Sequence, residues 1–210
     1  MRYLLLCAAF LGLAGQAAAQ PADKVTINEL VAPIALYPDV LVAQVLVAST
    51  HPDEIVNATS WLEAERPWDS RELAQEVDGN AWHPDIKALV LMRPVLDGLR
   101  RNFAWTAALG VAYTRHPEAV LDAVQALRHA ALAAGELTST SGQRVIVSGA
   151  TILLEPVDPQ FVYVPGGGVF DVGAYDRFAW GWHGWQVSWK DGVIRYQDAP
   201  YAALQTGLRP

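Results

Sequence analysis

The chain has 210 residues, of which 52% are hydrophobic and 18% are charged. Its net charge of −7 at pH 7 disfavours binding to nucleic acid and to anionic lipid, because both carry dense negative charge. The length and the hydrophobic content suffice for one buried core, so we predict one domain, at most in two parts.

The N-terminal segment has the three parts of a secretory signal peptide. Arg2 precedes an apolar run from Tyr3 to Ala14, and small residues end the segment at Ala19. The run is shorter than the roughly 20 residues of a membrane-spanning helix, which disfavours a retained anchor. Lipidation of Cys7 is also disfavoured, because no apolar segment precedes it. We therefore predict cleavage after Ala19 and a periplasmic or secreted chain that has no transmembrane segment.

Loss of residues 1–19 removes Cys7, which is the single cysteine, and Arg2. The mature chain then has a net charge of about −8. Without a cysteine it has no disulfide, no thiolate nucleophile and no zinc–sulfur site.

Helical patterns occupy residues 26–135. Thr26 and Glu29 have the spacing of a capping box, in which each side chain hydrogen-bonds the backbone of the other residue. The apolar run from Val40 to Ala48 follows Pro38 and Asp39, which mark a helix start. Because the run is too short to cross a bilayer, it predicts a buried core helix.

Three triplets combine a histidine, a proline and an acid: His51-Pro52-Asp53, His83-Pro84-Asp85 and His116-Pro117-Glu118. Proline suits the first helical position, and an acid in the first turn opposes the helix dipole. Iron(II) oxygenase sites use the same histidine–carboxylate spacing but need a second histidine from elsewhere. We interpret the triplets as helix starts and predict no metal site. The last helix is expected from about Pro117 to Ala134, with Gly135 as its stop.

The pattern changes to that of strands after Gly135. Arg144–Val147 and Thr151–Leu154 flank Ser148-Gly149 and predict a hairpin, and Phe161–Val164 predicts a third strand. Gly166–Gly168 could cradle a phosphate only if a helix followed, and none is expected. We therefore predict a flexible connector there.

The segment Trp180–Trp189 reads WGWHGWQVSW and precedes Asp191-Gly192, a strong signal for a two-residue turn. Such a turn pairs Lys190 with Val193 and Trp189 with Ile194. Because side chains alternate along a strand, one apolar face then gathers five residues, which are Trp185, Val187, Trp189, Ile194 and Tyr196. We expect this face to be buried, since soluble proteins rarely expose such a patch.

Trp180 and Trp182 differ from that face in parity and lie beside glycines. We predict that they form an exposed stacking surface for a sugar ring, a peptide aromatic or a partner chain, with His183 adding a polar contact. The alternative is that both tryptophans close one end of the core.

Six segments together resemble a bacterial family known as domain of unknown function 3300. They are LVAPIALYPDVLVAQVLVAST, SWLEAE, WHPDIKALV, NFAWTAALGVAY, AVLDAVQALRHAA and EPVDPQFVYVP, in this order from about Leu30 to Val164. The resemblance implies export from a Gram-negative cell and no assigned activity, so no catalytic residue can be transferred. It also implies that the chain after Pro165 is a short form of a low-complexity tail rich in Gly, Trp and His.

The predicted fold class is α+β, with an N-terminal bundle of about six short helices, a small antiparallel β section and a C-terminal hairpin. The predicted divisions are the signal peptide at 1–19, a helical region at 20–135, strands packed with the helices at 136–165, and a Gly/Trp-rich segment with a hairpin at 166–210.

Two functions compete. The first is a non-catalytic interaction module of the periplasm, whose partner is an envelope protein or a glycan and which has no cofactor. The second is a cell-wall polymer hydrolase or metal-dependent envelope enzyme. For the second, Glu63 and Glu65 lie on different faces of a helix, and no serine lies in a G-x-S-x-G motif. The sequence thus favours the first function and predicts no catalytic residue.

Overall fold

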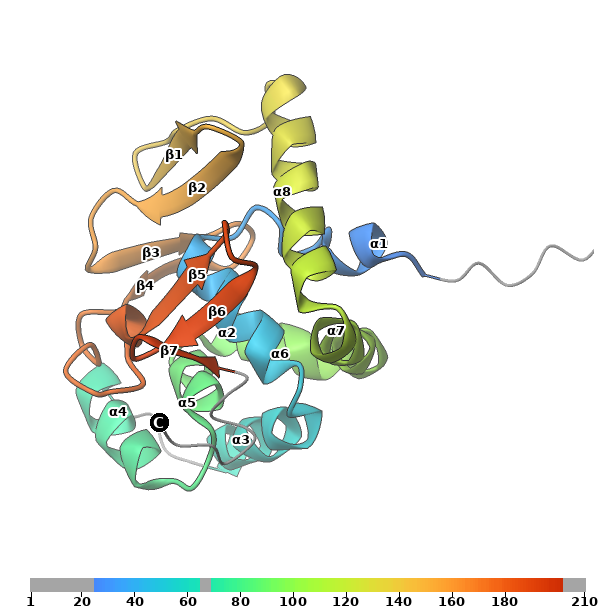
Figure 1. The fold of residues 1–210 in the computed structure, drawn as a ribbon. Coiled ribbons are helices and arrows are strands. Elements are labelled where there is room, and N and C mark those ends of the chain that lie inside the picture. The colour runs from blue at the N-terminus through green and yellow to red at the C-terminus, as the bar shows by residue number, and fades with distance from the viewer. Residues whose placement is uncertain (1–24, 65–68, 202–210) are drawn as a thin grey trace, which may run out of the picture.

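The computed structural model describes residues 25–64 and 69–201. Within them the chain forms helices first and short antiparallel strands afterwards, which confirms the predicted α+β class (Figure 1). The predicted signal peptide and Glu65 lie outside the described residues. The described helices are α1 Ile27–Val31, α2 Asp39–Ala48, α3 Pro52–Ala64, α4 Ser70–Gly79, α5 Pro84–Val90, α6 Arg93–Arg101, α7 Phe103–Arg115 and α8 Pro117–Ala133.

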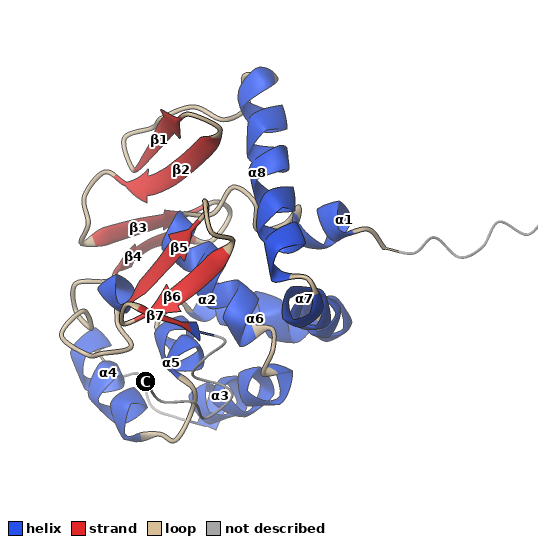
Figure 2. Ribbon diagram, in the orientation of Figure 1, coloured by secondary structure: helices blue, strands red, loops and turns tan. Residues whose placement is uncertain are grey.

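The described strands form three small antiparallel sheets. They are β1 Gln143–Ser148 with β2 Thr151–Pro156, β3 Phe161–Val164 with β4 Gly168–Asp171, and β5 Trp185–Ser188 with β6 Val193–Tyr196 and β7 Ala199–Pro200. A single 3-10 turn, Trp182–Gly184, precedes β5. Figure 2 shows the strands together on one side of the molecule, with α8 beside β1 and β2, and α4 and α5 at the opposite end.

The predicted helix starts are confirmed. Thr26 and Glu29 make both bonds of the capping box. The prolines of the three triplets are the first residues of α3, α5 and α8. The described residues contain eight helices where about six were expected, and one reason is Asn102, whose non-helical backbone separates α6 from α7.

Helix α2 is the centre of the core. All residues from Leu41 to Ala48 are buried, as the apolar run predicted. The helix packs against α5, α7 and β5, so it touches both the helices and the C-terminal sheet. A helix that is apolar on all sides is stable only when it is enclosed in this way.

Arg128 on α8 joins the helices to the strands. Its side chain is completely buried. Two of its donors reach the carbonyl oxygens of Ala35 and Tyr37 before α2, at 2.8 and 3.0 Å. Its Nη1 reaches both Asp39 Oδ1 at 2.6 Å and the carbonyl oxygen of Ile152 on β2 at 2.8 Å. One guanidinium thus fixes α2, α8 and β2 relative to one another.

Side chains satisfy the outer edge of β2. Gln125 Oε1 accepts from the Ile152 N–H at 2.8 Å, and Gln125 Nε2 donates to the Ile152 carbonyl at 3.1 Å. Asp39 Oδ1 accepts from the Leu154 N–H at 3.1 Å. These contacts replace a neighbouring strand, so this part of the edge is closed to further pairing.

The C-terminal sheet is held to the helices by aromatic donors and helical carboxylates. Three rings each donate one hydrogen bond to an aspartate: Trp189 to Asp39 at 2.8 Å, Trp180 to Asp78 at 2.8 Å, and Tyr201 to Asp85 at 3.1 Å. Figure 1 shows the C-terminal sheet over α2 and α5. The four tryptophans of the segment Trp180–Trp189 therefore belong to the core or pack against it.

The hairpin register predicted from Asp191-Gly192 is wrong by two residues. Val193 pairs with Ser188 instead of Lys190, and the other pairs shift accordingly. The loop thus has four residues, 189–192, and the Ser188 hydroxyl donates to the Asp191 carboxylate across it at 2.6 Å. Because a shift of two keeps paired side chains on the same face, Trp185, Val187, Ile194 and Tyr196 still share the predicted apolar face.

The longer loop releases Trp189 from the strand ladder. Its indole then reaches Asp39, and its ring lies 4.7 Å from the guanidinium carbon of Arg128. The apolar face was expected to be buried, and this is confirmed for Trp185 and Ile194, which are each 1% exposed. Val187, Trp189 and Tyr196 are partly buried and pack against the core.

The predicted flexible connector at Gly166–Gly168 is also wrong, because these glycines form a tight turn. Gly166 and Gly168 have φ values of +71° and +106°, which side chains rarely allow. The Gly167 N–H donates to the Val164 carbonyl at 2.9 Å. The turn leads into β4, a strand that the sequence pattern did not reveal, whereas β3 has its predicted bounds.

Candidate functional site

The β3–β4 hairpin exposes one apolar face. Along β3, Phe161 and Tyr163 are 42% and 39% exposed, whereas Val162 and Val164 are 0% and 1% exposed. Val169 on β4, which is 65% exposed, lies directly opposite Tyr163. The two valines of β3 thus anchor the hairpin in the core and turn both aromatic rings outward.

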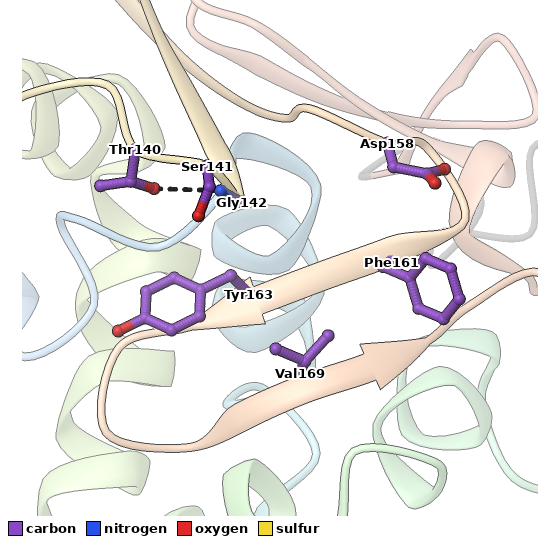
Figure 3. A pocket seen from close by; sticks show the side chains of 7 residues that line it. All are labelled: Thr140, Ser141, Gly142, Asp158, Phe161, Tyr163 and Val169. Carbon is purple, nitrogen blue, oxygen red and sulfur yellow. Dashed lines mark hydrogen bonds between the residues drawn. The ribbon is translucent and has the colours of Figure 1, made fainter.

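This face forms one wall of a pocket of about 610 Å³. Its walls are the turn Thr140–Gly142 before β1, Asp158 in the β2–β3 turn, and the exposed face of the hairpin. Figure 3 shows the Tyr163 ring near the Thr140–Gly142 turn and the Phe161 ring near Asp158. We call these seven residues the hairpin pocket: Thr140, Ser141, Gly142, Asp158, Phe161, Tyr163 and Val169.

Gly142 allows the ring of Tyr163 to approach the backbone. A Cβ on Gly142 would lie 3.3 Å from Tyr163 Cβ and 3.8 Å from Tyr163 Cγ. The turn is held by Thr140, whose hydroxyl oxygen accepts from the N–H groups of Gly142 and Gln143 at 3.3 and 3.1 Å. The Gly142 carbonyl in turn accepts from the Val157 N–H at 3.1 Å. The pocket wall is thereby fixed to both ends of the first hairpin.

The polar groups of the hairpin pocket are hydroxyls and one carboxylate. Thr140, Ser141 and Tyr163 contribute hydroxyls. Asp158 uses Oδ1 to accept from the Gln160 N–H at 2.9 Å, which orders the turn. None of the residues that line the pocket is basic. The pocket therefore combines flat aromatic surface with neutral and negative hydrogen-bonding groups.

This set of groups suits binding better than catalysis. A hydrolytic site needs two converging carboxylates, a nucleophile with an adjacent base, or a metal. The lining residues include one carboxylate and no histidine, lysine or cysteine. Concave, largely apolar sites with a few polar groups are the usual form of small-ligand sites.

The predicted exposure of Trp180 and Trp182 is wrong. They are only 3% and 4% exposed, so neither ring offers an open stacking face. Trp180 stacks against Tyr175 and against Phe178, with ring centroids 5.7 and 4.9 Å away. Gly181 permits this packing, because a Cβ there would lie 2.7 Å from the Tyr175 carbonyl oxygen. Their proposed role in binding stays a prediction.

His183 is the accessible member of the predicted group, with 59% of its side chain exposed. Its Nδ1 contacts the carboxylate of Asp176, which also accepts from the His183 N–H at 3.0 Å. A second pocket of about 380 Å³, between β2 and β5, includes His183, Trp182 and Trp185 in its lining. Its opposite wall contains Arg144 and Glu155, which pair with each other at 3.5 Å.

Two of the three triplets meet in space. The rings of His51 and His83 have centroids 3.8 Å apart. Glu54 accepts from the His83 N–H at 2.9 Å and contacts His83 Nδ1 at 2.6 Å. Burial and the neighbouring His83 lower the pKa of His51. In the described part of the chain, no three His, Cys, Asp or Glu side chains form a group that could hold a metal ion.

The carboxylates considered for hydrolysis contribute no catalytic pair in the described residues. Glu63 forms an ion pair with Arg100 on α6, and Glu65 lies outside the described residues.

The sequence analysis did not predict the hairpin pocket. The alternation in Phe-Val-Tyr-Val was a usable signal, because it places both aromatics on one face. The opposing Val169 could not be found without β4.

Comparison with known proteins identifies relatives but no activity. A family described as "Protein of unknown function (DUF3300)" matches residues 23–207. The match thus extends past Val164, into the segment that was expected to be a tail. The "Uncharacterized protein YacH" of Escherichia coli (strain K12) is 37% identical over 123 residues, which are 58% of this chain and 20% of that protein. The chain therefore spans about a fifth of that relative's length.

No solved structure matches the chain. In residues 25–64 and 69–201, none of the helices is both long enough and apolar enough to cross a bilayer.

Proposed function

The chain belongs to the DUF3300 family, and we propose that it is an exported, non-catalytic binding module of the cell envelope that holds a neutral glycan chain in the hairpin pocket. One observation carries this proposal, namely the exposed pair of rings, Phe161 and Tyr163, on a strand whose alternate residues are buried. The signal-peptide pattern at residues 1–19 supports a location in the periplasm or outside the cell, where glycans are abundant.

The chemistry of the pocket favours a sugar over other ligands. A pyranose ring presents a flat C–H face, which packs on an aromatic ring, and hydroxyls at its rim. The hydroxyls of Thr140 and Ser141 can donate to such a rim and accept from it, and the carboxylate of Asp158 can accept from its hydroxyls. Two aromatic rings on one strand can contact successive sugars of a chain.

The charge of the site selects a neutral glycan. None of the seven described residues that line the pocket is basic, and Asp158 contributes negative charge. The whole chain has a net charge of −7, which repels polyanions such as nucleic acid or sulfated glycans. A neutral chain is bound without this repulsion.

We expect the purified protein to bind immobilised neutral oligosaccharides, and the Phe161→Ala/Tyr163→Ala variant to bind them at least about tenfold more weakly. Tenfold corresponds to about 1.4 kcal/mol, which two stacked rings can supply. Chitotetraose, cellotetraose and maltotetraose are suitable probes in surface plasmon resonance. Phe103→Ala is the matched control, since Phe103 is also 42% exposed but lies on α7, away from the pocket.

Three results would refute the proposal. They are equal affinity of the double variant and the wild type, an equal loss with Phe103→Ala, and binding of an extended peptide or a sulfated glycan with no binding of the neutral probes. Because Phe161 and Tyr163 are exposed, the double variant should keep the melting temperature of the wild type within about 2 °C.

A further inference from the structure

Asp85 is a buried acid with an incomplete set of partners. It is 0% exposed and lies in the first turn of α5. Its Oδ1 accepts from the Tyr201 hydroxyl at 3.1 Å, whereas its Oδ2 is buried with no hydrogen-bond partner in the described residues. A buried polar atom without a partner is rare in native proteins and calls for an explanation.

The partner of Asp85 belongs to the C-terminal sheet. Tyr201 directly follows β7, and its ring packs against Trp185 of β5 with centroids 5.7 Å apart. Trp185 also contacts Tyr196 of β6, at 4.7 Å between centroids. Asp85 thus lies beneath an aromatic layer that contains one residue from β5, one from β6 and one just after β7.

The first triplet provides an internal comparison. Asp53 has the same position after His51-Pro52 that Asp85 has after His83-Pro84, yet Asp53 is exposed. Both acids can serve the helix dipole equally well. Burial of Asp85 is therefore not needed to start the helix.

We propose that Asp85 is a proton-controlled latch, which docks the β6–β7 end of the C-terminal sheet onto α5 when the carboxyl group is protonated and releases it when the proton leaves. A neutral acid has no charge to desolvate in a buried site where Oδ2 has no partner, whereas a buried carboxylate has lost its hydration and regains it only by opening. Release would also uncover the aromatic layer of Trp185 and Tyr201.

Ionisable groups lie on each of the elements that surround Asp85. The ionisable side chains that face it or its aromatic layer are His83 ahead of α5, Glu54 on α3, Asp78 on α4, Tyr196 on β6 and Tyr201 after β7. Helix α2 has one ionisable group, Asp39, which pairs with Arg128. At the start of α6, Arg93 pairs with Asp97 at 3.6 Å.

The direction of the pH effect follows from burial. Burial raises the pKa of Asp85 from 3.8 to about 7, against the smaller lowering effects of its own N–H, Tyr201 and His83. The stabilising effect of the bound proton is complete below the unfolded pKa of 3.8 and is lost as pH rises through about 7. Opening should therefore increase with pH.

Hydrogen exchange of the β6 amides measures this opening in the intact protein. With pKa values of about 7 closed and 3.8 open, the opening constant should rise about thirtyfold between about pH 5.5 and about pH 8.5, after correction for intrinsic exchange. Amides of α2 in the same sample report global unfolding. Asp85→Asn should reduce the rise to about twofold or less, because asparagine has no proton to lose in this range.

Asp53→Asn is the matched control and should keep the thirtyfold rise. Asp85→Asn keeps both stacked histidines, so any pH dependence that they cause remains in that variant. Tyr201→Phe retains the carboxyl group of Asp85 and is the alternative test variant if Asp85→Asn does not fold. Since the Tyr201 hydroxyl lowers the pKa of Asp85, the upper plateau of the opening curve should move to higher pH in Tyr201→Phe.

The latch is refuted if β6 exchange in the wild type, after correction, is independent of pH, or if Asp85→Asn retains the wild-type rise. An unmoved plateau in Tyr201→Phe refutes it as well. A rise shared equally by α2 amides also refutes it, because it would indicate global unfolding instead of local release.

Discussion

Replacing Arg128 by methionine should remove about 3–5 kcal/mol of the free energy of unfolding, the largest loss that we expect from a single side chain in this protein. Methionine keeps much of the volume but provides no donor. The paired Asp39, whose side chain is 16% exposed, would lose its counter-ion. The carbonyl oxygens of Ala35 and Ile152 would lose a donor in a buried setting.

The loss should be large relative to the total, since domains of this size are stable by only about 5–15 kcal/mol. The ring of Trp189 would also lose the cation above it. Burial lowers the pKa of Arg128, and Asp39 opposes that effect, so the guanidinium remains charged and the pair intact at neutral pH.

Urea unfolding of the Arg128→Met and Arg100→Met variants measures how much free energy of unfolding each substitution removes. Arg100 also pairs with an acid, Glu63, but their side chains are 38% and 50% exposed, so its loss should amount to about 1 kcal/mol or less. If the two variants lost the same small amount, the buried network would not have the central structural role assigned to it.

A second large effect is expected at Gly110, where alanine should destabilise the fold by about 3 kcal/mol although it favours helices. Gly110 lies in α7 where this helix crosses the end of α2. A Cβ there would lie 1.9 Å from the carbonyl oxygen of Ser49 and 2.9 Å from the backbone nitrogen of Thr50. Because these atoms belong to the backbone, no side-chain rotation can relieve the clash.

Gly98→Ala is the matched control for that substitution. Gly98 lies inside α6, and a Cβ added there would meet nothing within 4 Å. Alanine should therefore stabilise the protein by up to about 1 kcal/mol through helix propensity alone. Opposite shifts in melting temperature are expected for the two variants. A stabilising Gly110→Ala would show that α7 does not pack against α2 as described.

Local signals in the sequence predicted much of the helical part. The capping box at Thr26 and the prolines at positions 52, 84 and 117 fix helix starts through chemistry within one turn. The length of the apolar run in α2 similarly predicted its burial, because a short helix without polar faces must be enclosed.

Features set by distant contacts could not be predicted in this way. Arg128 on α8 binds Asp39, which lies far away in sequence, and no local pattern shows that an arginine will be buried. The hairpin loop before β6 was misassigned because Asp191-Gly192 favours a two-residue turn, whereas the bond from Trp189 to Asp39 favours a longer loop. Tertiary contacts thus overrode turn propensity.

In the candidate site, too, the sequence predicted the local pattern but not the tertiary packing. Alternation along β3 places Phe161 and Tyr163 on one face, but only the packing of the sheets determines which face is exposed. The reverse holds for Trp180 and Trp182, whose glycine neighbours indicated an open loop. Those glycines instead let the chain pack closely, since a Cβ on Gly184 would lie 2.4 Å from the Ala179 carbonyl oxygen.

The most direct test of glycan binding is an NMR titration of the ¹⁵N-labelled protein with chitotetraose, cellotetraose and maltotetraose. We expect saturable amide shifts for at least one of them, confined to the Thr140–Gly142 turn and to residues 158–171. Shifts centred on residues 180–187, or no shifts at millimolar sugar, would contradict the assignment of the hairpin pocket as a glycan site.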